Sequence, residues 1–361
     1  MQPKAIINLK SLRYNINYIK SLINHKANIM PVVKANAYGH GYVEIITILK
    51  KENIDCVCVA TIKEVKQILE LNLGINILHL GRISIDMLQT YTNNNIIATI
   101  NSIDDINMID KLKIEKIRCH IKVNTGMNRM GCDFDKLDSI ISAAKQSVNI
   151  KLEGVYSHLA SSYDIKSEHN KFQINNFNNI MINYKNNSFY YHLLSSGGMI
   201  NFPDYHLDGI RCGLSLYGIS PFDHVNKNLK PVMKFVAPIV LIKYINKGEK
   251  IGYDCTYTSN QKMKIALIQC GYADGVPLEF SNAGSVFYNK KKLSILGKVS
   301  MDLICIDCTN IDIDTGDYVC LWGDEQYEET NLNIISEKFD SIPYVYLTGV
   351  SDRVKRIYID E

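Results

Sequence analysis

Short apolar runs recur along the chain from residue 29 to residue 211, and longer mixtures of polar and apolar residues separate them. Such runs are typical of buried parallel strands, whereas mixtures such as 61–72 and 135–147 have the periodicity of amphipathic helices. A further amphipathic helix is predicted over 11–24. The predicted strands lie near 29–34, 55–60, 76–80, 96–100, 117–123, 152–158, 189–194 and 207–211. Eight alternating strand and helix units predict an α/β fold, a (β/α)8 TIM-type barrel whose functional face lies at the carboxyl ends of its strands.

Beyond Lys230 the apolar runs become short and alternating, and Gly, Asn and Asp turns separate them. Such runs predict the strands of a mostly-β domain. They lie at 235–244, 263–270, 284–288, 302–308 and 317–322. We therefore predict a barrel domain over residues 1–230 and a C-terminal β domain over residues 231–361. The first few residues of the chain are expected to pair with the second domain.

The composition argues against several classes of function. The chain has 361 residues, of which 46% are hydrophobic, and its 40 basic residues are interspersed with 37 acidic ones. Because no basic block offers a surface for polyanions, nucleic-acid binding is not expected. No apolar stretch is long enough to span a bilayer and the start of the chain lacks a signal-peptide pattern, so we expect no membrane contact and a cytoplasmic location. The cysteines lie mostly in apolar runs, which favours reduced thiols, and no metal site is expected at the isolated pair Cys305 and Cys308.

Lys34 lies in unusual surroundings for a lysine. It follows the apolar run Ile29–Val33 and precedes small residues, a tyrosine and two glycines within 35–41. At the carboxyl end of the first barrel strand its amine is expected to be partly desolvated, and desolvation favours the neutral, nucleophilic amine. Such a lysine suits covalent attachment of an aldehyde cofactor, for example pyridoxal phosphate. A surface lysine whose alkyl chain passes a strand end is the alternative.

Polar side chains also follow the fifth and sixth predicted strands. Lys122 lies in the fifth strand and Arg129 in the loop after it, where a guanidinium could bind a carboxylate through two hydrogen bonds. His158 ends the sixth strand and could contact a cofactor there. A structural ion pair of Arg129 and a buried core histidine at position 158 are the alternatives.

The loops after the seventh and eighth predicted strands contain serine, glycine and arginine. Ser195–Gly198 and Arg211–Gly218 occupy the positions at which many barrels build a phosphate site from backbone N–H groups and hydroxyls. Arg211 ends an apolar strand, where an unpaired guanidinium is costly, so it requires an anion or an acceptor. A buried pair with Asp208 is the alternative.

Six ordered motifs together resemble the alanine racemase family, the fold-type III enzymes that use pyridoxal phosphate. They span nearly the whole chain, at 33–41, 124–131, 211–218, 252–258, 271–275 and 297–302. The first reads Val-Lys-Ala-Asn-Ala-Tyr-Gly-His-Gly and the second Asn-Thr-Gly-Met-Asn-Arg-Met-Gly. The resemblance implies an isomerase that interconverts L- and D-alanine by two-base proton transfer. It also implies a homodimer in which each second domain covers the barrel of the other subunit.

The resemblance implies roles for individual residues. Lys34 corresponds to the Schiff-base lysine and the base on the D-face, and Tyr253, reaching in from the partner subunit, corresponds to the base on the L-face. Arg211 corresponds to the donor to the pyridine nitrogen, supported by His158. The remaining residues correspond to the phosphate site (Tyr38, Ser196, Gly213 and Leu214), the substrate site (Arg129, Met301 and Tyr272) and a lysine carbamylated in several members (Lys122).

The chain departs from the family pattern around the pocket. Asp352 stands where the family usually has a tyrosine. This replacement predicts a larger, more polar pocket and makes serine the alternative substrate. The other possibility is that Asp352 turns toward Arg353 or solvent. Tyr163 and Leu278 replace charged residues usual at the entrance, which predicts a changed access channel. A fold-type III amino-acid decarboxylase and a non-catalytic pyridoxal-phosphate-binding protein are further alternatives. Tyr253 argues against the decarboxylase, and the presence of a C-terminal domain argues against the binding protein.

Overall fold

The first large unit of the molecule is a ring of parallel strands. The computed structural model describes residues 1–111, 116–220 and 222–360. Strands β3 to β9 follow one another across a curled sheet, and β10 pairs with β2. Isolated bridges from Val32 to Cys58 and from Ser195 to Arg211 close the ring. The strands are β2 (Asn28–Ile29), β3 (Cys56–Val59), β4 (Asn76–His79), β5 (Ile96–Ile100), β6 (Ile117–Asn124), β8 (Ile150–Tyr156), β9 (Tyr190–His192) and β10 (Gly209–Ile210). The predicted α/β barrel is thus confirmed.

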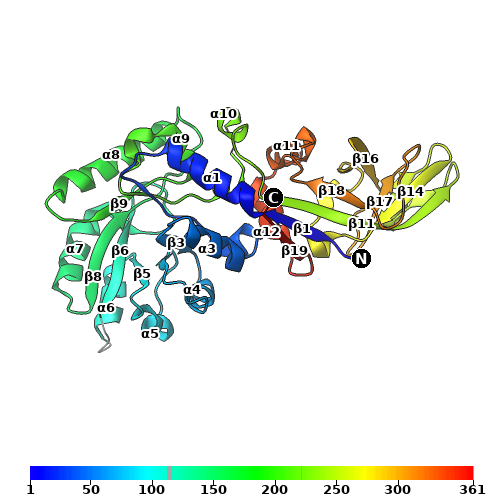
Figure 1. The fold of residues 1–361 in the computed structure, drawn as a ribbon. Helices are drawn as coiled ribbons and strands as arrows, with labels where there is room; N and C mark the ends of the chain where they lie inside the picture. The colour runs from blue at the N-terminus through cyan, green and yellow to red at the C-terminus, as the bar shows by residue number, and fades with distance from the viewer. Residues whose placement is uncertain (112–115, 221, 361) are drawn as a thin grey trace.

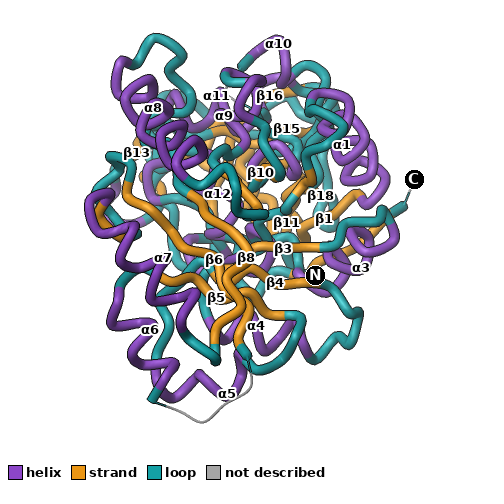
Figure 2. Tube along the Cα trace, turned by 90° about the vertical axis from the view of Figure 1, so that its left-hand side faces the viewer, coloured by secondary structure: helices purple, strands orange, loops and turns teal. Residues whose placement is uncertain are grey.

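Amphipathic helices surround this ring (Figure 2). Helix α4 shows how the sequence begins one of them, because the Thr61 hydroxyl accepts a hydrogen bond from the backbone N–H of Glu64, whose carboxylate in turn accepts one from the Thr61 N–H. Its Val65 and Ile68 are buried. The helices are α1 (Leu9–Leu22), α3 (Tyr42–Lys51), α4 (Ile62–Leu69), α5 (Leu88–Tyr91), α6 (Ile103–Asp110), α7 (Leu137–Gln146), α8 (Glu168–Asn183) and α9 (Ser196–Asn201).

The second unit is a closed antiparallel sheet, which lies beside the barrel in Figure 1. Its strand order is β14–β17–β16–β15–β18–β11, and β11 also pairs with β14. The strands are β11 (Met233–Ile245), β14 (Met263–Ile268), β15 (Ser285–Tyr288), β16 (Lys291–Leu296), β17 (Ile304–Asp307) and β18 (Tyr318–Trp322). The mostly-β character predicted for this part of the chain is confirmed. The sequence pattern missed β16, whose Lys291, Lys292 and Ser294 are exposed.

The chain termini join the two units. Strand β1 (Lys4–Asn8) pairs with β11 on one side and with β19 (Lys355–Ile359) on the other. Helix α12 (Pro343–Gly349) precedes β19 and packs against the turn that follows Lys34. Among the described residues, no helix combines the length and the apolar character needed to cross a membrane.

Candidate active site

A cavity of about 470 Å³ opens at the carboxyl ends of the barrel strands. Its volume lies in the range typical of small-molecule sites. Most of the residues predicted in the barrel meet there: Lys34, Tyr38, Lys122, Arg129, His158, Ser196, Arg211 and Gly213. Leu214 is buried directly after Gly213. Residues far apart in the sequence are brought together because each follows a strand of the same parallel ring.

Lys34 begins a turn of unusual handedness. Residues 35–38 all have φ near +50°, the left-handed region that is costly for residues other than glycine. Neighbouring groups hold this turn: Glu64 Oε1 accepts a hydrogen bond from the Ala35 N–H at 2.7 Å, and Asn36 Oδ1 accepts one from the Tyr42 N–H at 3.0 Å. The buried His40 ring contacts the carbonyls of the same turn through Nδ1. The turn therefore fixes the backbone that presents Lys34 to the cavity.

Arg211 is buried and clamped by acceptors. Its Nη1 donates to Nδ1 of His192 at 2.6 Å and to the His192 carbonyl, and its Nη2 donates to the carbonyls of Ser157 and Leu193 and to Nδ1 of His158 at 3.1 Å. Nε has no partner within the described part of the chain. The only unpaired N–H group of this guanidinium is therefore the one available to an acceptor in the cavity.

The structure does not contain the alternative buried ion pair between Arg211 and Asp208. Asp208 accepts a hydrogen bond from the backbone N–H of Tyr191 at 2.7 Å instead. Burial and the positive charge of Arg211 lower the pKa of His158 to about 3, so this imidazole is neutral at neutral pH and can accept from the guanidinium.

The cavity carries positive charge without a carboxylate. Lys122 is buried, and its burial together with the charges of Arg211, Arg129 and Lys34 lowers its pKa to about 8. No Asp or Glu side chain of the described residues lines the cavity. Arg129 is exposed and forms no ion pair within the same residues, so its guanidinium is available to an anion. Such a cavity favours anionic ligands.

Hydroxyl and backbone donors converge at one side of the cavity. Ser196 Oγ accepts hydrogen bonds from the backbone N–H groups of Gly213 at 3.0 Å and Ser215 at 3.4 Å. The Tyr38 hydroxyl lies directly over Gly213, where an added Cβ would come within 2.8 Å of the hydroxyl oxygen. Serine and tyrosine hydroxyls beside the last two barrel loops form a cradle for a phosphate group.

Sequence reasoning missed Tyr156 and Tyr344 as cavity residues. The Tyr156 ring stacks on His192 and lies 5.1 Å from the guanidinium carbon of Arg211. Tyr344, on α12, brings its ring to 5.6 Å from the Tyr38 ring and its hydroxyl to 3.1 Å from that of Tyr163. The sequence around these residues does not indicate this role. Tyr156 lies in a buried strand, and Tyr344 lies more than 300 residues beyond Lys34.

Besides the buried Leu214, four predicted site residues lie outside the cavity of their own chain. Tyr253, Met301 and Tyr272 are 70%, 50% and 44% exposed on the second domain. Asp352 is fully exposed in this chain and lies 4.0 Å from Arg356, which agrees with the alternative that it turns toward solvent, while Tyr344 lines the cavity. An ionised carboxylate at this position stays in water, where its charge is solvated.

Two family models cover the chain. The model described as alanine racemase, N-terminal domain, matches residues 7–221, and that described as alanine racemase, C-terminal domain, matches residues 232–358. The chain belongs to the alanine racemase family. Membership places it in a class of pyridoxal-phosphate-dependent isomerases. The resemblance stated from the six motifs is thus confirmed.

Full-length relatives agree with this assignment. Alanine racemases of Methanococcus maripaludis and Halothermothrix orenii are 32% and 33% identical to the chain, covering 98% of it and 98% and 96% of their own lengths. An alanine racemase structure from Clostridium difficile 630 has a TM-score of 0.93 at 31% identity and covers the whole chain and 96% of its own. One from Bartonella henselae, with covalently bound pyridoxal phosphate, has a TM-score of 0.89 at 29% identity, covering 99% of this chain and 100% of its own.

Proposed function

We propose that this protein interconverts L- and D-alanine on pyridoxal phosphate held in the barrel cavity, with Lys34 and Tyr253 of the partner subunit as the two bases. The observation that carries the proposal is the meeting of Lys34, the unpaired Nε–H of Arg211 and the hydroxyl cradle in one cationic cavity. These groups match the aldehyde, ring nitrogen and phosphate of the cofactor. When bound, pyridoxal phosphate supplies the conjugated system that makes the α-proton of an amino acid removable.

Arg211 sets the electronic character of this site. A guanidinium donates a hydrogen bond but keeps its proton at ordinary pH, so Arg211 leaves a ring nitrogen unprotonated. A pyridine ring with an unprotonated nitrogen withdraws electrons less strongly than a protonated one. Negative charge at the α-carbon is then less stabilised and shorter-lived, which limits side reactions. His158 supports this role because it accepts from Nη2 and fixes the plane of the guanidinium.

Proton transfer on two faces requires two bases. Lys34 lies in the cavity and can remove or return the α-proton on one face. Tyr253 lies outside the cavity of its own chain, 70% exposed, together with Met301 and Tyr272. A homodimer in which the second domain of one subunit covers the barrel of the other supplies the opposite base, and Arg129 binds the substrate carboxylate.

We infer that the substrate is alanine, on which the curated relatives act by name, rather than serine. The case for serine rests on an acidic pocket wall at Asp352, and in this chain that carboxylate is exposed while Tyr344 lines the cavity. A decarboxylase would not need Tyr253 as a second base, and a non-catalytic binding protein would not need the second domain. The presence of both features in this chain argues against these two alternatives. The ten free cysteines are compatible with a cytoplasmic location.

Hydrogen exchange at the α-carbon tests this function. Protein loaded with pyridoxal phosphate should incorporate solvent deuterium into both alanine enantiomers and racemise them, whereas no exchange with the cofactor bound would contradict the proposal. Tyr253→Phe should keep the cofactor and lose exchange from L-alanine more than from D-alanine. Tyr244→Phe, at a second-domain tyrosine that is 69% exposed, is the matched control and should retain activity.

A further inference from the structure

A second cavity, of about 400 Å³, lies at the amino-terminal ends of the barrel strands. Its walls combine apolar side chains, among them Ile23, Ile29 and Ile54, with the side chains of Arg118 and His120. This end of the barrel lies opposite the proposed racemase site. The cavity has the size and the mixed lining of a small-molecule site, and the proposed function makes no use of it.

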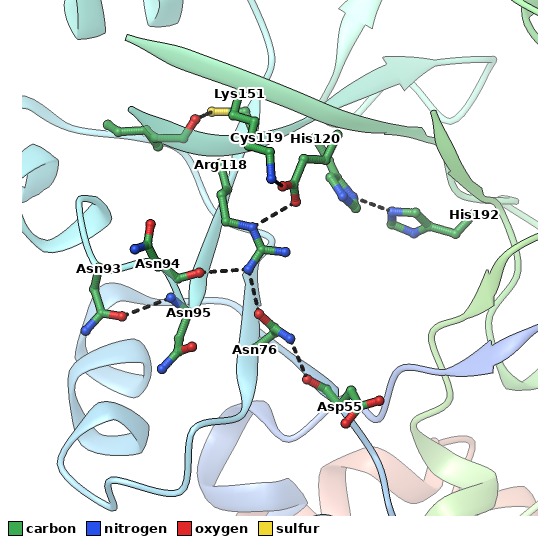
Figure 3. Close-up of polar contacts among 12 residues, drawn as sticks. Asp55, Asn76, Asn93, Asn94, Asn95, Arg118, Cys119, His120, Lys151 and His192 are labelled. Atoms are coloured by element: carbon green, nitrogen blue, oxygen red, sulfur yellow. Dashed lines mark hydrogen bonds and ion pairs between the residues drawn. The ribbon is translucent and has the colours of Figure 1, made fainter. Parts of the chain in front are cut away.

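His120 brings an unpaired donor to this cavity. The ring is 3% exposed, and its Nδ1 lies 3.0 Å from Nε2 of His192, as Figure 3 shows. Within the described residues, Nε2 of His120 has no hydrogen-bond partner. Gly154 makes room for the ring, because an added Cβ there would come within 2.9 Å of the ring atoms Cε1 and Nε2. A ring nitrogen that faces a cavity without a protein partner can donate to a water or to a ligand atom there.

Arg211 determines which nitrogen of the His120 ring carries the proton. The guanidinium can only donate, so Nδ1 of His192 accepts and the proton of that neutral ring lies on Nε2. His192 Nε2–H then donates to Nδ1 of His120, and the proton of His120 lies on Nε2, at the cavity. Burial lowers the pKa of His120 to about 4, which keeps this ring neutral.

Arg118 adds a second donor at the same cavity. Its Nε donates to Glu153 at 2.9 Å and its Nη1 to Asn76 Oδ1 and the Asn94 carbonyl, so Nη2 remains without a partner among the described residues (Figure 3). Two N–H donors beside aliphatic walls suit a ligand with one acceptor oxygen and a short apolar body. Glu153 pairs with both Arg118 and Lys151, so one carboxylate is shared by two cations.

We propose that this cavity binds a small aliphatic molecule through a carbonyl or carboxylate oxygen placed on His120 Nε2–H, and that binding is transmitted through His192 to Arg211. A ligand that accepts from His120 strengthens each following hydrogen bond of the chain, because hydrogen bonds in series polarise one another. The binding step is independent of the proposed racemase function, and only its effect on the bound cofactor rests on that function.

Nuclear magnetic resonance of protein labelled with ¹⁵N at histidine tests the binding. Three probes share one branched chain: 3-methylbutanamide, 3-methylbutanoate and 3-methylbutylamine. The amide, the carboxylate or both should shift the His120 Nε2–H signal saturably and move the His192 signal with it, and a response to only one of them identifies the ligand as neutral or anionic. The amine, which has no acceptor oxygen, should not. Equal binding of the amine, or no saturable shift with any probe, would overturn the proposal.

Two variants test separately the contributions of the His120 donor and of the cavity walls to binding. His120→Phe should weaken binding of the active probe at least about tenfold, as expected for loss of one buried hydrogen bond. His25→Phe replaces an exposed histidine outside the cavity and should leave binding unchanged. If His120→Phe unfolds the protein, Ala27→Leu, which narrows the cavity and retains the donor, should abolish binding instead. Unchanged affinity in a folded His120→Phe or Ala27→Leu protein would contradict the site.

With pyridoxal phosphate bound, the same probe should also shift the visible absorption band of the cofactor. A shift of the His120 signal without a change in that band retains the site and overturns its transmission to Arg211. Loss of racemase activity does not enter either readout, so failure of the proposed function would be distinguishable from failure of this inference.

Discussion

At the scale of single residues, Arg211 and Lys122 show how burial determines chemistry. Arg211 has both terminal nitrogens occupied by carbonyls and neutral imidazoles, which leaves Nε–H for a ligand. Burial lowers the pKa of Lys122, and the charges of three cationic neighbours lower it further. The amine of Lys122 is thus a much better nucleophile at neutral pH than an ordinary lysine. A negative charge at this position would relieve the repulsion.

We predict that Lys122 forms a carbamate with dissolved carbon dioxide, in which the neutral amine adds to carbon dioxide and releases a proton. Its pKa of about 8 means that the neutral amine increases as the pH rises from 6 to 8, so the carbamate should increase over the same range. A ¹³C carbamate signal in labelled bicarbonate should be absent in Lys122→Gln.

Lys136 is the internal control for this prediction. It is exposed, and its hydrogen bond to Asp133 raises its pKa, so it stays protonated and should form no carbamate. A carbamate signal that does not rise with pH, or that persists in Lys122→Gln, would contradict the assignment.

At the scale of elements, the phosphate cradle depends on the close approach of two loops. The loop after β10 brings Gly213 beneath the Tyr38 hydroxyl, and Ser196 at the start of α9 accepts from its N–H group. A side chain at Gly213 would push the tyrosine away from the cradle. The left-handed turn over residues 35–38 fixes the other side of the cradle.

We predict that Gly213→Ala weakens binding of pyridoxal phosphate by about tenfold or more, because displacement of Tyr38 removes one hydrogen bond to a charged group. Equilibrium dialysis against the cofactor measures this effect. Gly349→Ala is the matched control, since an added Cβ there meets its nearest atom at 3.8 Å, an ordinary contact. Unchanged affinity in a folded Gly213→Ala protein would contradict the cradle.

The elements also show what the sequence could predict. The barrel strands were predictable because they are short apolar runs, and Lys122 and His158 lie within or just beyond the carboxyl ends of two of them. The left-handed turn was not, because Ala and Tyr have no preference for positive φ and Asn36 alone tolerates it. Hydrogen bonds of Glu64 and of the Asn36 side chain hold the turn. The orientation of Asp352 stayed open at the level of the sequence, because alignment gives the position of a residue and not the direction of its side chain.

At the scale of the whole molecule, the proposed function gives the second domain two different contributions to the site. Tyr344 on α12 enters the cavity of its own chain, whereas Tyr253 is exposed on the far unit and lies outside that cavity. The sequence predicted the second contribution only through family resemblance, and it missed the first. A single chain therefore holds one proposed base in its cavity, and the central claim is that the other comes from a second copy.

Defined heterodimers test this claim most directly. We would pair a Lys34→Ala chain with a Tyr253→Phe chain, isolate the mixed dimer through two different affinity tags and measure racemisation of alanine. One of its two sites would then combine an intact Lys34 with an intact Tyr253 from the other copy, so about half of the activity of the unsubstituted dimer should return. A dimer of an unsubstituted chain with a chain carrying both substitutions should be inactive. Activity in the second dimer and none in the first would contradict the account.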